Sequence, residues 1–218
     1  MVFKLSPSSI GLMQECARCF WLEKHGVWKR PEGITASLMN GMDKILKVHF
    51  DKFRDSGKLP PELCYHEQCE NLKLFGDQEL LRKWRNNLQG IRWTDSDGNV
   101  LFGAVDNILM REDKLIVLDF KTRGFALKED TSAHYQHQLD IYNLLLRKNG
   151  YKTEDYGFLL FYIPEKVLET GEFVFESKLV KMEANPAHAE KLFREAIGLL
   201  NGECPKKGCD WCEKVCEV

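Results

Sequence analysis

Apolar residues recur at helical spacing in several separate stretches of this chain. The first stretch follows Ser6-Pro7-Ser8-Ser9, which offers an N-cap, and predicts a helix running to about Gly26. The segment Lys29–Thr35 contains Pro31 and Gly33 and predicts a loop. Further helices are predicted over residues 37–54, 77–89, 131–149, which Gly150 closes as a C-cap, and 185–200.

Apolar runs bounded by turn residues predict strands in the second half of the chain. A strand over residues 100–110 follows the turn signal Asp95-Ser96-Asp97-Gly98, and a second strand over 115–120 follows Arg111-Glu112-Asp113. Two more strands, over 156–163 and 172–181, flank a connection from Pro164 to Gly171. This order of elements predicts an α/β fold with a central mixed sheet flanked by helices.

Composition and charge narrow the class of protein. With 218 residues, 44% of them hydrophobic and 29% charged, the chain is typical of one globular domain over residues 1–218. No apolar run approaches the length that spans a bilayer, so we expect a cytoplasmic protein without membrane contact. The net charge of −2 argues against a protein that coats nucleic acid, but local basic clusters at 24–30, 82–92 and 121–128 are still able to contact phosphate.

Acidic residues lie at the ends of two neighbouring predicted strands. The second strand ends in Asp119-x-Lys121, and these two side chains share one face because side chains alternate along a strand. A two-residue loop that pairs Arg111 with Lys114 would place Asp106 opposite Asp119 on that face, whereas a three-residue loop would separate them. Carboxylates of this kind suit Mg²⁺ or Mn²⁺, and a neighbouring lysine offsets phosphate charge. The pattern indicates metal-assisted cleavage of a phosphodiester.

This constellation resembles the signature of the PD-(D/E)XK nuclease superfamily, which implies a restriction-endonuclease-like fold. The segment Gly41–His49 resembles the histidine motif of its RecB-like branch, and Gly103-Ala104-Val105-Asp106 resembles the Gly-x-x-Asp strand of that branch. Gln138-Leu139-Asp140-Ile141-Tyr142 resembles its Gln-x-x-x-Tyr helix, and Ser6-Pro7-Ser8-Ser9 ahead of Cys16-Ala17-Arg18-Cys19-Phe20 resembles its N-terminal helix. The motifs occur in the order of that branch along nearly the whole chain.

The resemblance assigns roles to individual residues. Lys121 would orient the attacking water, while Gln138 and Tyr142, one helical turn apart, would position the DNA strand or Lys121. Tyr135 and His137 are weaker candidates on the same helix. The ligands implied for the divalent metal are His49, Asp106, Asp119 and the carbonyl of Phe120.

Eight cysteines point to a second metal. Without a secretion signal, the pairs Cys16-x-x-Cys19 and Cys209-x-x-Cys212 indicate ligation of Zn²⁺ or a [4Fe–4S] cluster rather than disulfides. RecB-like nucleases with an iron–sulfur staple join one N-terminal cysteine to three near the C-terminus. That resemblance favours iron–sulfur and selects Cys16, Cys209 and Cys212. The fourth ligand stays open among Cys19, Cys204 and Cys216, and Cys64 and Cys69, around His66, are expected to be ordinary thiols.

The expected function is that of a divalent-metal-dependent DNA nuclease whose cysteine-bound metal ties the two chain ends together. The resemblance implies exonuclease action on single strands or DNA ends, with protein partners from CRISPR adaptation or recombinational DNA repair. One alternative is a non-catalytic DNA-binding or assembly module with an iron–sulfur or zinc cluster, although the intact acidic set argues against it. A second alternative, an RNA-processing enzyme, has no RNA-binding motif in its favour.

Overall fold

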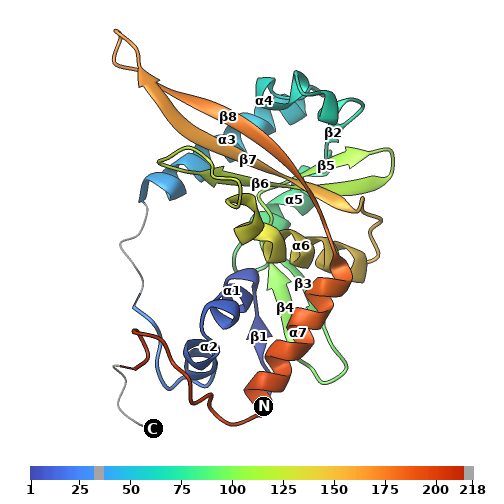
Figure 1. The fold of residues 1–218 in the computed structure, drawn as a ribbon. Coiled ribbons are helices and arrows are strands. Elements are labelled where there is room, and N and C mark those ends of the chain that lie inside the picture. Colours follow the sequence, from blue (N-terminus) through green and yellow to red (C-terminus); the bar gives the residue numbers. More distant parts are fainter. Residues whose placement is uncertain (32–36, 214–218) are drawn as a thin grey trace.

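The computed structural model describes residues 1–31 and 37–213 (Figure 1). Its helices are α1 (Pro7–Glu15), α2 (Ala17–Lys24), α3 (Ser37–Asp55), α4 (Pro61–Cys64), α5 (Gln78–Arg85), α6 (Gln136–Lys148) and α7 (Pro186–Asn201), with short 3₁₀ helices η1 (Glu67–Cys69) and η2 (Ser132–Tyr135). Its strands are β1 (Lys4–Leu5), β2 (Lys73–Leu74), β3 (Ile91–Thr94), β4 (Val100–Gly103), β5 (Asn107–Arg111), β6 (Lys114–Thr122), β7 (Tyr156–Val167) and β8 (Phe173–Glu183).

The strands form two mixed sheets, which confirms the predicted α/β class. The larger sheet has the order β2-β5-β6-β7-β8, and its only parallel pair within the described residues is β6 with β7. Helix α6 makes the crossover between these two strands, as a parallel connection requires. The smaller sheet has the order β1-β4-β3 (Figure 1). The chain passes from the smaller to the larger sheet between β4 and β5.

Strand β6 is buried on both faces, and the alternation of its side chains sorts them into two cores. Ile116, Leu118 and Phe120 belong to the core under α3, which includes Leu46 and Phe50. The intervening residues Leu115 and Val117 belong to the core formed with α6 and α7. Asp119 and Lys121 continue this second series. The strand therefore directs both of them toward α6.

The predicted first helix is two helices that meet at Cys16. This residue has an extended backbone (φ −157°, ψ 104°), and its sulfur accepts a hydrogen bond from the Cys19 amide at 3.5 Å. Cys16 therefore ends α1 and caps α2. The expectation of one continuous helix was wrong because apolar spacing does not detect such a break.

The predicted strand over residues 100–110 is likewise divided, into β4 and β5, and residues 104–106 lie outside both sheets. The hairpin between β5 and β6 has the two-residue loop considered in the sequence: Arg111 pairs with Lys114, and Glu112 takes a positive φ of 54°. Asn107 pairs with Leu118, so Asp106 precedes the ladder at the level of Asp119. The register on which the acidic pair depends is thus confirmed.

Strands β7 and β8 extend beyond their predicted limits and form a long hairpin that projects from the body of the molecule (Figure 1). Pro164 lies inside this hairpin next to an irregularity in the pairing, between Pro164 and Lys166, where a missing amide donor is tolerated.

At the opposite end of the molecule, α1 and α2 pack against α7. None of the described helices has the length and apolarity needed to cross a membrane.

Candidate active site and cysteine centre

The end of β6 places a carboxylate and an ammonium group in contact inside the protein. Asp119 is 1% exposed, and its Oδ2 forms an ion pair with Lys121 Nζ. Burial raises the pKa of the Asp119 carboxyl to about 7, against the lowering effect of Lys121, and the charge of Asp106 adds to the rise. A bound cation would favour the ionised carboxylate and so oppose the burial effect.

Asp106 reaches the same place from the irregular segment between β4 and β5. Its Oδ2 accepts a hydrogen bond from the Phe120 amide at 2.9 Å, and its Oδ1 lies 3.0 Å from Lys47 Nζ. The structure thus brings Asp106 to the β6 backbone between Asp119 and Lys121. The carbonyl of Phe120, the fourth group predicted from the sequence as a ligand, lies in this short stretch of β6.

Helix α6 contributes one amide that joins the members of this group. Gln138 Nε2 donates to Asp119 Oδ1 at 3.1 Å, and Gln138 Oε1 accepts from Lys121 Nζ at 2.9 Å. The same Nε2 lies 2.9 Å from the hydroxyl of Tyr142, one helical turn further on. Gln138 therefore orients both charged residues of β6, and Tyr142 fixes the Gln138 amide.

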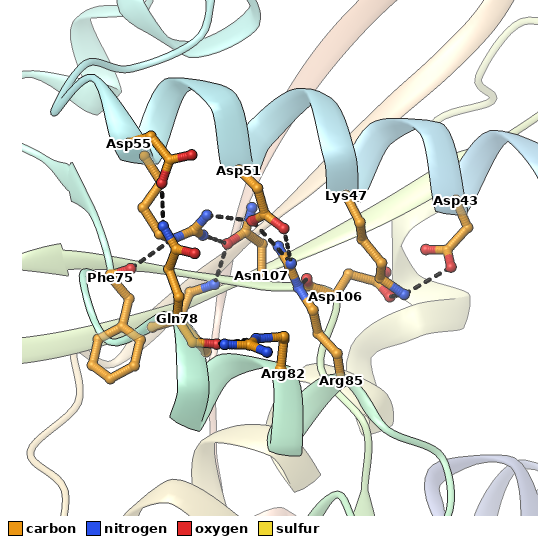
Figure 2. A network of polar contacts seen from close by, with 12 residues as sticks. Asp43, Lys47, Asp51, Asp55, Phe75, Gln78, Arg82, Arg85, Asp106 and Asn107 are labelled. Carbon is orange, nitrogen blue, oxygen red and sulfur yellow. Dashed lines mark hydrogen bonds and ion pairs between the residues drawn. The ribbon is translucent and has the colours of Figure 1, made fainter.

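Helix α3 adds two charged residues that the sequence analysis missed. Lys47 Nζ lies between two carboxylates, 2.7 Å from Asp43 Oδ2 and 3.0 Å from Asp106 Oδ1 (Figure 2). Burial raises the pKa of Asp43 and the nearby Asp106 adds to this, while Lys47 lowers it. Asp43, Lys47 and Asp51 recur every four residues, so they share one face of α3, and this spacing was the available signal.

His49 is not brought to the acidic group. Its Nε2 lies 3.1 Å from Glu62 Oε1 on α4, and its ring packs edge-on against Phe50 and Phe53. Two residues along a helix correspond to a rotation of about 200°. With Lys47 turned toward Asp106, His49 is directed away from it.

The carboxylates around the end of β6 have the donor chemistry of a site for a divalent cation such as Mg²⁺ or Mn²⁺, although the one group of three or more side chains among the described residues that could hold an ion as they stand is a set of four cysteines elsewhere. Three carboxylates, those of Asp43, Asp106 and Asp119, face two ammonium groups, those of Lys47 and Lys121, which leaves an excess of negative charge when all of them are ionised. Asp119 Oδ2 is buried and accepts no well-aligned hydrogen bond from the described residues beyond its ion pair with Lys121. Hard oxygen ligands of this type are those that Mg²⁺ and Mn²⁺ prefer.

A cavity of about 720 Å³ lies on the side of Gln138 and Tyr142, and the carboxylates around the end of β6 do not line it. The N-terminal turn of α1 and residues of β4, η2 and α6 surround it, and Gln138 and Tyr142 form part of its wall. Tyr135 and His137 also line it, and the ring centroid of Tyr135 lies 4.6 Å from Lys121 Nζ. Arg30 also contributes to the wall of the cavity.

Four cysteines from the two ends of the chain form a separate centre. The sulfurs of Cys16, Cys19, Cys209 and Cys212 all lie within 4.8 Å of one another. The sulfurs are 3.5 Å apart between Cys19 and Cys209, 3.8 Å between Cys16 and Cys212, and 3.9 Å between Cys209 and Cys212. The structure therefore groups Cys19 with the three cysteines selected from the sequence.

The other cysteines lie elsewhere. Cys204 is half-buried, and its sulfur contacts the carbonyl of Pro205 rather than joining the group. Cys64 is exposed and Cys69 is buried, and both are free thiols. Cys216, the remaining candidate for a fourth ligand, lies outside the described residues.

Hydrogen bonds and burial act in opposite directions on the thiols of the cysteine centre. Arg30 Nη2 lies 3.6 Å from the sulfur of Cys19 and 3.7 Å from that of Cys209, while its Nη1 forms an ion pair with Glu15 at 2.7 Å. Hydrogen bonds from the backbone of Cys212 and Trp211 lower the pKa of the Cys209 thiol to about 6, against burial. Burial raises the pKa of Cys19 to about 12, which a bound metal would reverse.

Two comparisons relate this chain to known nucleases. The family model of the PD-(D/E)XK nuclease superfamily matches residues 4–218. The chain is also 27% identical, over 123 residues, to an ATP-dependent helicase/nuclease subunit from Clostridium botulinum (strain Alaska E43 / Type E3). This match covers 56% of the chain but 9% of that relative, so the chain corresponds to a small part of it.

Proposed function

Because this chain belongs to the PD-(D/E)XK nuclease superfamily, we propose that it is a divalent-metal-dependent deoxyribonuclease that hydrolyses phosphodiester bonds. The observation that carries this proposal is the connected group at the end of β6. Three segments of the chain meet in this group. Asp119 and Lys121 lie on β6 and form an ion pair with each other, while Asp106 and Gln138 bind to β6 through hydrogen bonds. A nuclease site needs such a set of hard ligands beside a cation that faces phosphate.

The metal ligands in this proposal are Asp106, Asp119 and the carbonyl of Phe120, with Asp43 in place of His49. Asp43 is preferred because Lys47 links it to Asp106, whereas His49 contacts Glu62. The bound cation would polarise the scissile phosphate and lower the pKa of a water molecule.

The remaining residues act on the water and the phosphate. Lys121 would hold the attacking water and offset the charge that develops on the phosphate oxygens. Gln138 keeps Lys121 and Asp119 oriented through its two hydrogen bonds, and Tyr142 holds Gln138. Lys47 would balance the charge of Asp43 and Asp106 near the substrate.

The proposed substrate is a single DNA strand or a DNA end. The cavity next to Gln138 and Tyr142 offers aromatic and basic groups such as Tyr135 and Arg30, which suit the bases and phosphates of an unpaired strand. The helicase/nuclease relative supports a nuclease activity. A role in recombinational repair or CRISPR adaptation, with the DNA-handling proteins of those processes as partners, is proposed from the resemblance of the sequence motifs alone.

The proposed occupant of the cysteine centre is a single Zn²⁺. Four thiolates at about 2.3 Å from one tetrahedral ion lie about 3.8 Å apart. Three of the six sulfur separations, at 3.5 to 3.9 Å, agree with that value, and all six are within 4.8 Å. In a [4Fe–4S] cluster each thiolate binds a different iron, so the four cysteine sulfurs would lie further apart than around one ion. This spacing favours zinc over the iron–sulfur cluster expected from the resemblance.

Cleavage of end-labelled oligonucleotides tests the nuclease proposal. Purified protein is incubated with single-stranded and duplex DNA in Mn²⁺ or in EDTA. We expect cleavage with Mn²⁺ only, faster on single strands, and a loss of about 100-fold or more in Asp119→Asn. The matched control is Asp113→Asn, an exposed aspartate in the turn just before the same strand, whose ion pair with Lys152 is at the surface. Metal-independent cleavage, or equal rates in Asp119→Asn and wild type, would refute the proposal.

A further inference from the structure

The segment that carries Asp106 has no strand pairing of its own. Residues 104–106 leave β4 and enter β5 without joining either sheet, yet Asp106 must face Asp119 for the site to form. Backbone groups outside a ladder need other partners. The Val105 amide donates to the Trp84 carbonyl of α5 at 3.2 Å, and the Asp106 carbonyl accepts from a side chain. Figure 2 shows a network of polar side chains from α3 and α5 around this segment.

Arg85, the last residue of α5, holds the backbone of Asp106 directly. Its Nε donates to the Asp106 carbonyl at 2.7 Å, and its side chain is 9% exposed. The Nη1 of the same guanidinium binds both carboxylate oxygens of Asp51, at 2.9 and 2.8 Å. One planar group therefore joins the Asp106 backbone to helix α3.

Arg54 on α3 holds the next residue. Its Nη2 donates to the side-chain oxygen of Asn107, and that oxygen also accepts the amide of Ile108 at 3.0 Å. Its Nε donates to the carbonyl of Phe75 at 2.6 Å, and its Nη1 binds Asp51 at 2.6 Å. The Arg54 side chain is 2% exposed.

Burying these charged groups costs free energy of folding, which points to a role other than stability. Two guanidinium groups share the single carboxylate of Asp51, and burial together with the charge of Arg85 lowers the pKa of Arg54 to about 10, against Asp51 and Asp55. Buried ion pairs are often no more stabilising than apolar residues of the same volume. Here the two guanidinium groups donate hydrogen bonds to Asp106 and Asn107, where β5 begins.

We propose that Arg85 and Arg54, joined through Asp51, are positioning residues that hold the Asp106 backbone so that its carboxylate faces Asp119. This inference rests on the proposed metal site, because its consequence is the affinity of that site for a divalent cation. Residues that bind the metal ligands rather than the metal typically contribute roughly 10- to 100-fold to metal affinity or activity. The face that α3 turns toward the sheet thus carries both Asp43, next to Asp106, and the residues that hold the Asp106 backbone.

The test compares Mn²⁺ binding in Arg85→Lys and wild type by electron paramagnetic resonance of the free ion. Lysine keeps the charge but loses the fork that reaches Asp51 and the Asp106 carbonyl together. We expect the Mn²⁺ dissociation constant to rise by roughly 10- to 100-fold. Arg82→Lys, an exposed arginine one turn earlier on α5 that contacts only its own helix among the described residues, is the matched control and is expected to bind as wild type.

Two further variants separate positioning from general destabilisation. Ala196→Gly in α7 lowers stability by about 1 kcal/mol away from the site and should leave Mn²⁺ binding unchanged. If Arg85→Lys fails to fold, Asp51→Asn at the half-exposed centre of the network replaces it, with the same expected loss of affinity.

Unchanged Mn²⁺ affinity in the folded network variant would overturn the positioning role, whatever the nuclease activity. A wild type that binds no Mn²⁺ would refute the proposed metal site itself, and wild-type binding that Asp106→Ala does not reduce would refute Asp106 as its ligand.

Discussion

At the scale of single residues, Gly103 explains why a glycine precedes the acidic residue of the Gly-x-x-Asp motif. A Cβ atom at position 103 would lie 2.6 and 2.9 Å from two ring carbons of Tyr142. Because Tyr142 is 4% exposed and lies 2.9 Å from Gln138 Nε2, its ring has little room to move. The hydrogen of Gly103 therefore permits the close approach of β4 and α6 on which the Gln138 contacts depend.

Gly103→Ala should reduce both stability and activity. We expect a loss of about 1–3 kcal/mol in the free energy of unfolding, as for other overpacked cores, and a lower rate of DNA cleavage at saturating Mn²⁺. Chemical denaturation and single-turnover cleavage measure the two effects. Gly198→Ala in α7, where a Cβ meets nothing within 4 Å, is the control and should be neutral or stabilising. Equal stability of the two variants would contradict this account of Gly103.

At the scale of elements, the rotation of α3 selects the residues that reach the site. Leu46 and Phe50 are buried against β6, and this fixes the helix so that Asp43 and Lys47 lie near Asp106. The helix itself was predicted within one residue of its observed end. Which of its polar residues faces the sheet depends on packing against β6. In this structure Lys47 faces Asp106, whereas His49 faces Glu62.

Asp43→Asn and His49→Gln distinguish the two candidate ligands on α3. We expect Asp43→Asn to weaken Mn²⁺ binding by at least about tenfold, because it removes one charge from the donor set. His49→Gln should leave Mn²⁺ affinity unchanged and cost at most about 1 kcal/mol of stability through its half-exposed contact with Glu62. Calorimetric titration with Mn²⁺ and thermal melting provide both readouts. The reverse order of affinities would restore His49 as the ligand.

At the scale of the whole molecule, the cysteine centre joins the two ends of the chain. Cys16 and Cys212 are 196 residues apart in sequence, and their sulfurs are 3.8 Å apart. Arg30 connects this centre to the cavity beside the active site, since it lies near two cysteine sulfurs and also lines the cavity. A metal at this position would close nearly the entire chain into one loop.

Removal of this metal should destabilise the protein. Cys16→Ser, or treatment with a strong chelator, is expected to cost about 3 kcal/mol or more, and so to lower Tm by roughly 6–12 °C. Cys64→Ser, at an exposed cysteine outside the centre, should melt as wild type. Metal analysis should find one zinc per chain, lost in Cys16→Ser. A brown protein with about four irons would instead support the iron–sulfur cluster.

The sequence by itself determined the local parts of this design. Side-chain alternation placed Asp119 and Lys121 on one face of β6, and helical spacing paired Gln138 with Tyr142. These relations depend on backbone geometry over a few residues. The sequence left the loop before β6 open between two and three residues, and the structure showed the two-residue loop that aligns Asp106. Tertiary structure alone decided that Lys47 rather than His49 meets Asp106, that Cys19 rather than Cys204 joins the sulfurs, and that Arg85 holds the Asp106 backbone. Each of these contacts joins distant segments, so it depends on how whole elements pack together, which no local pattern encodes.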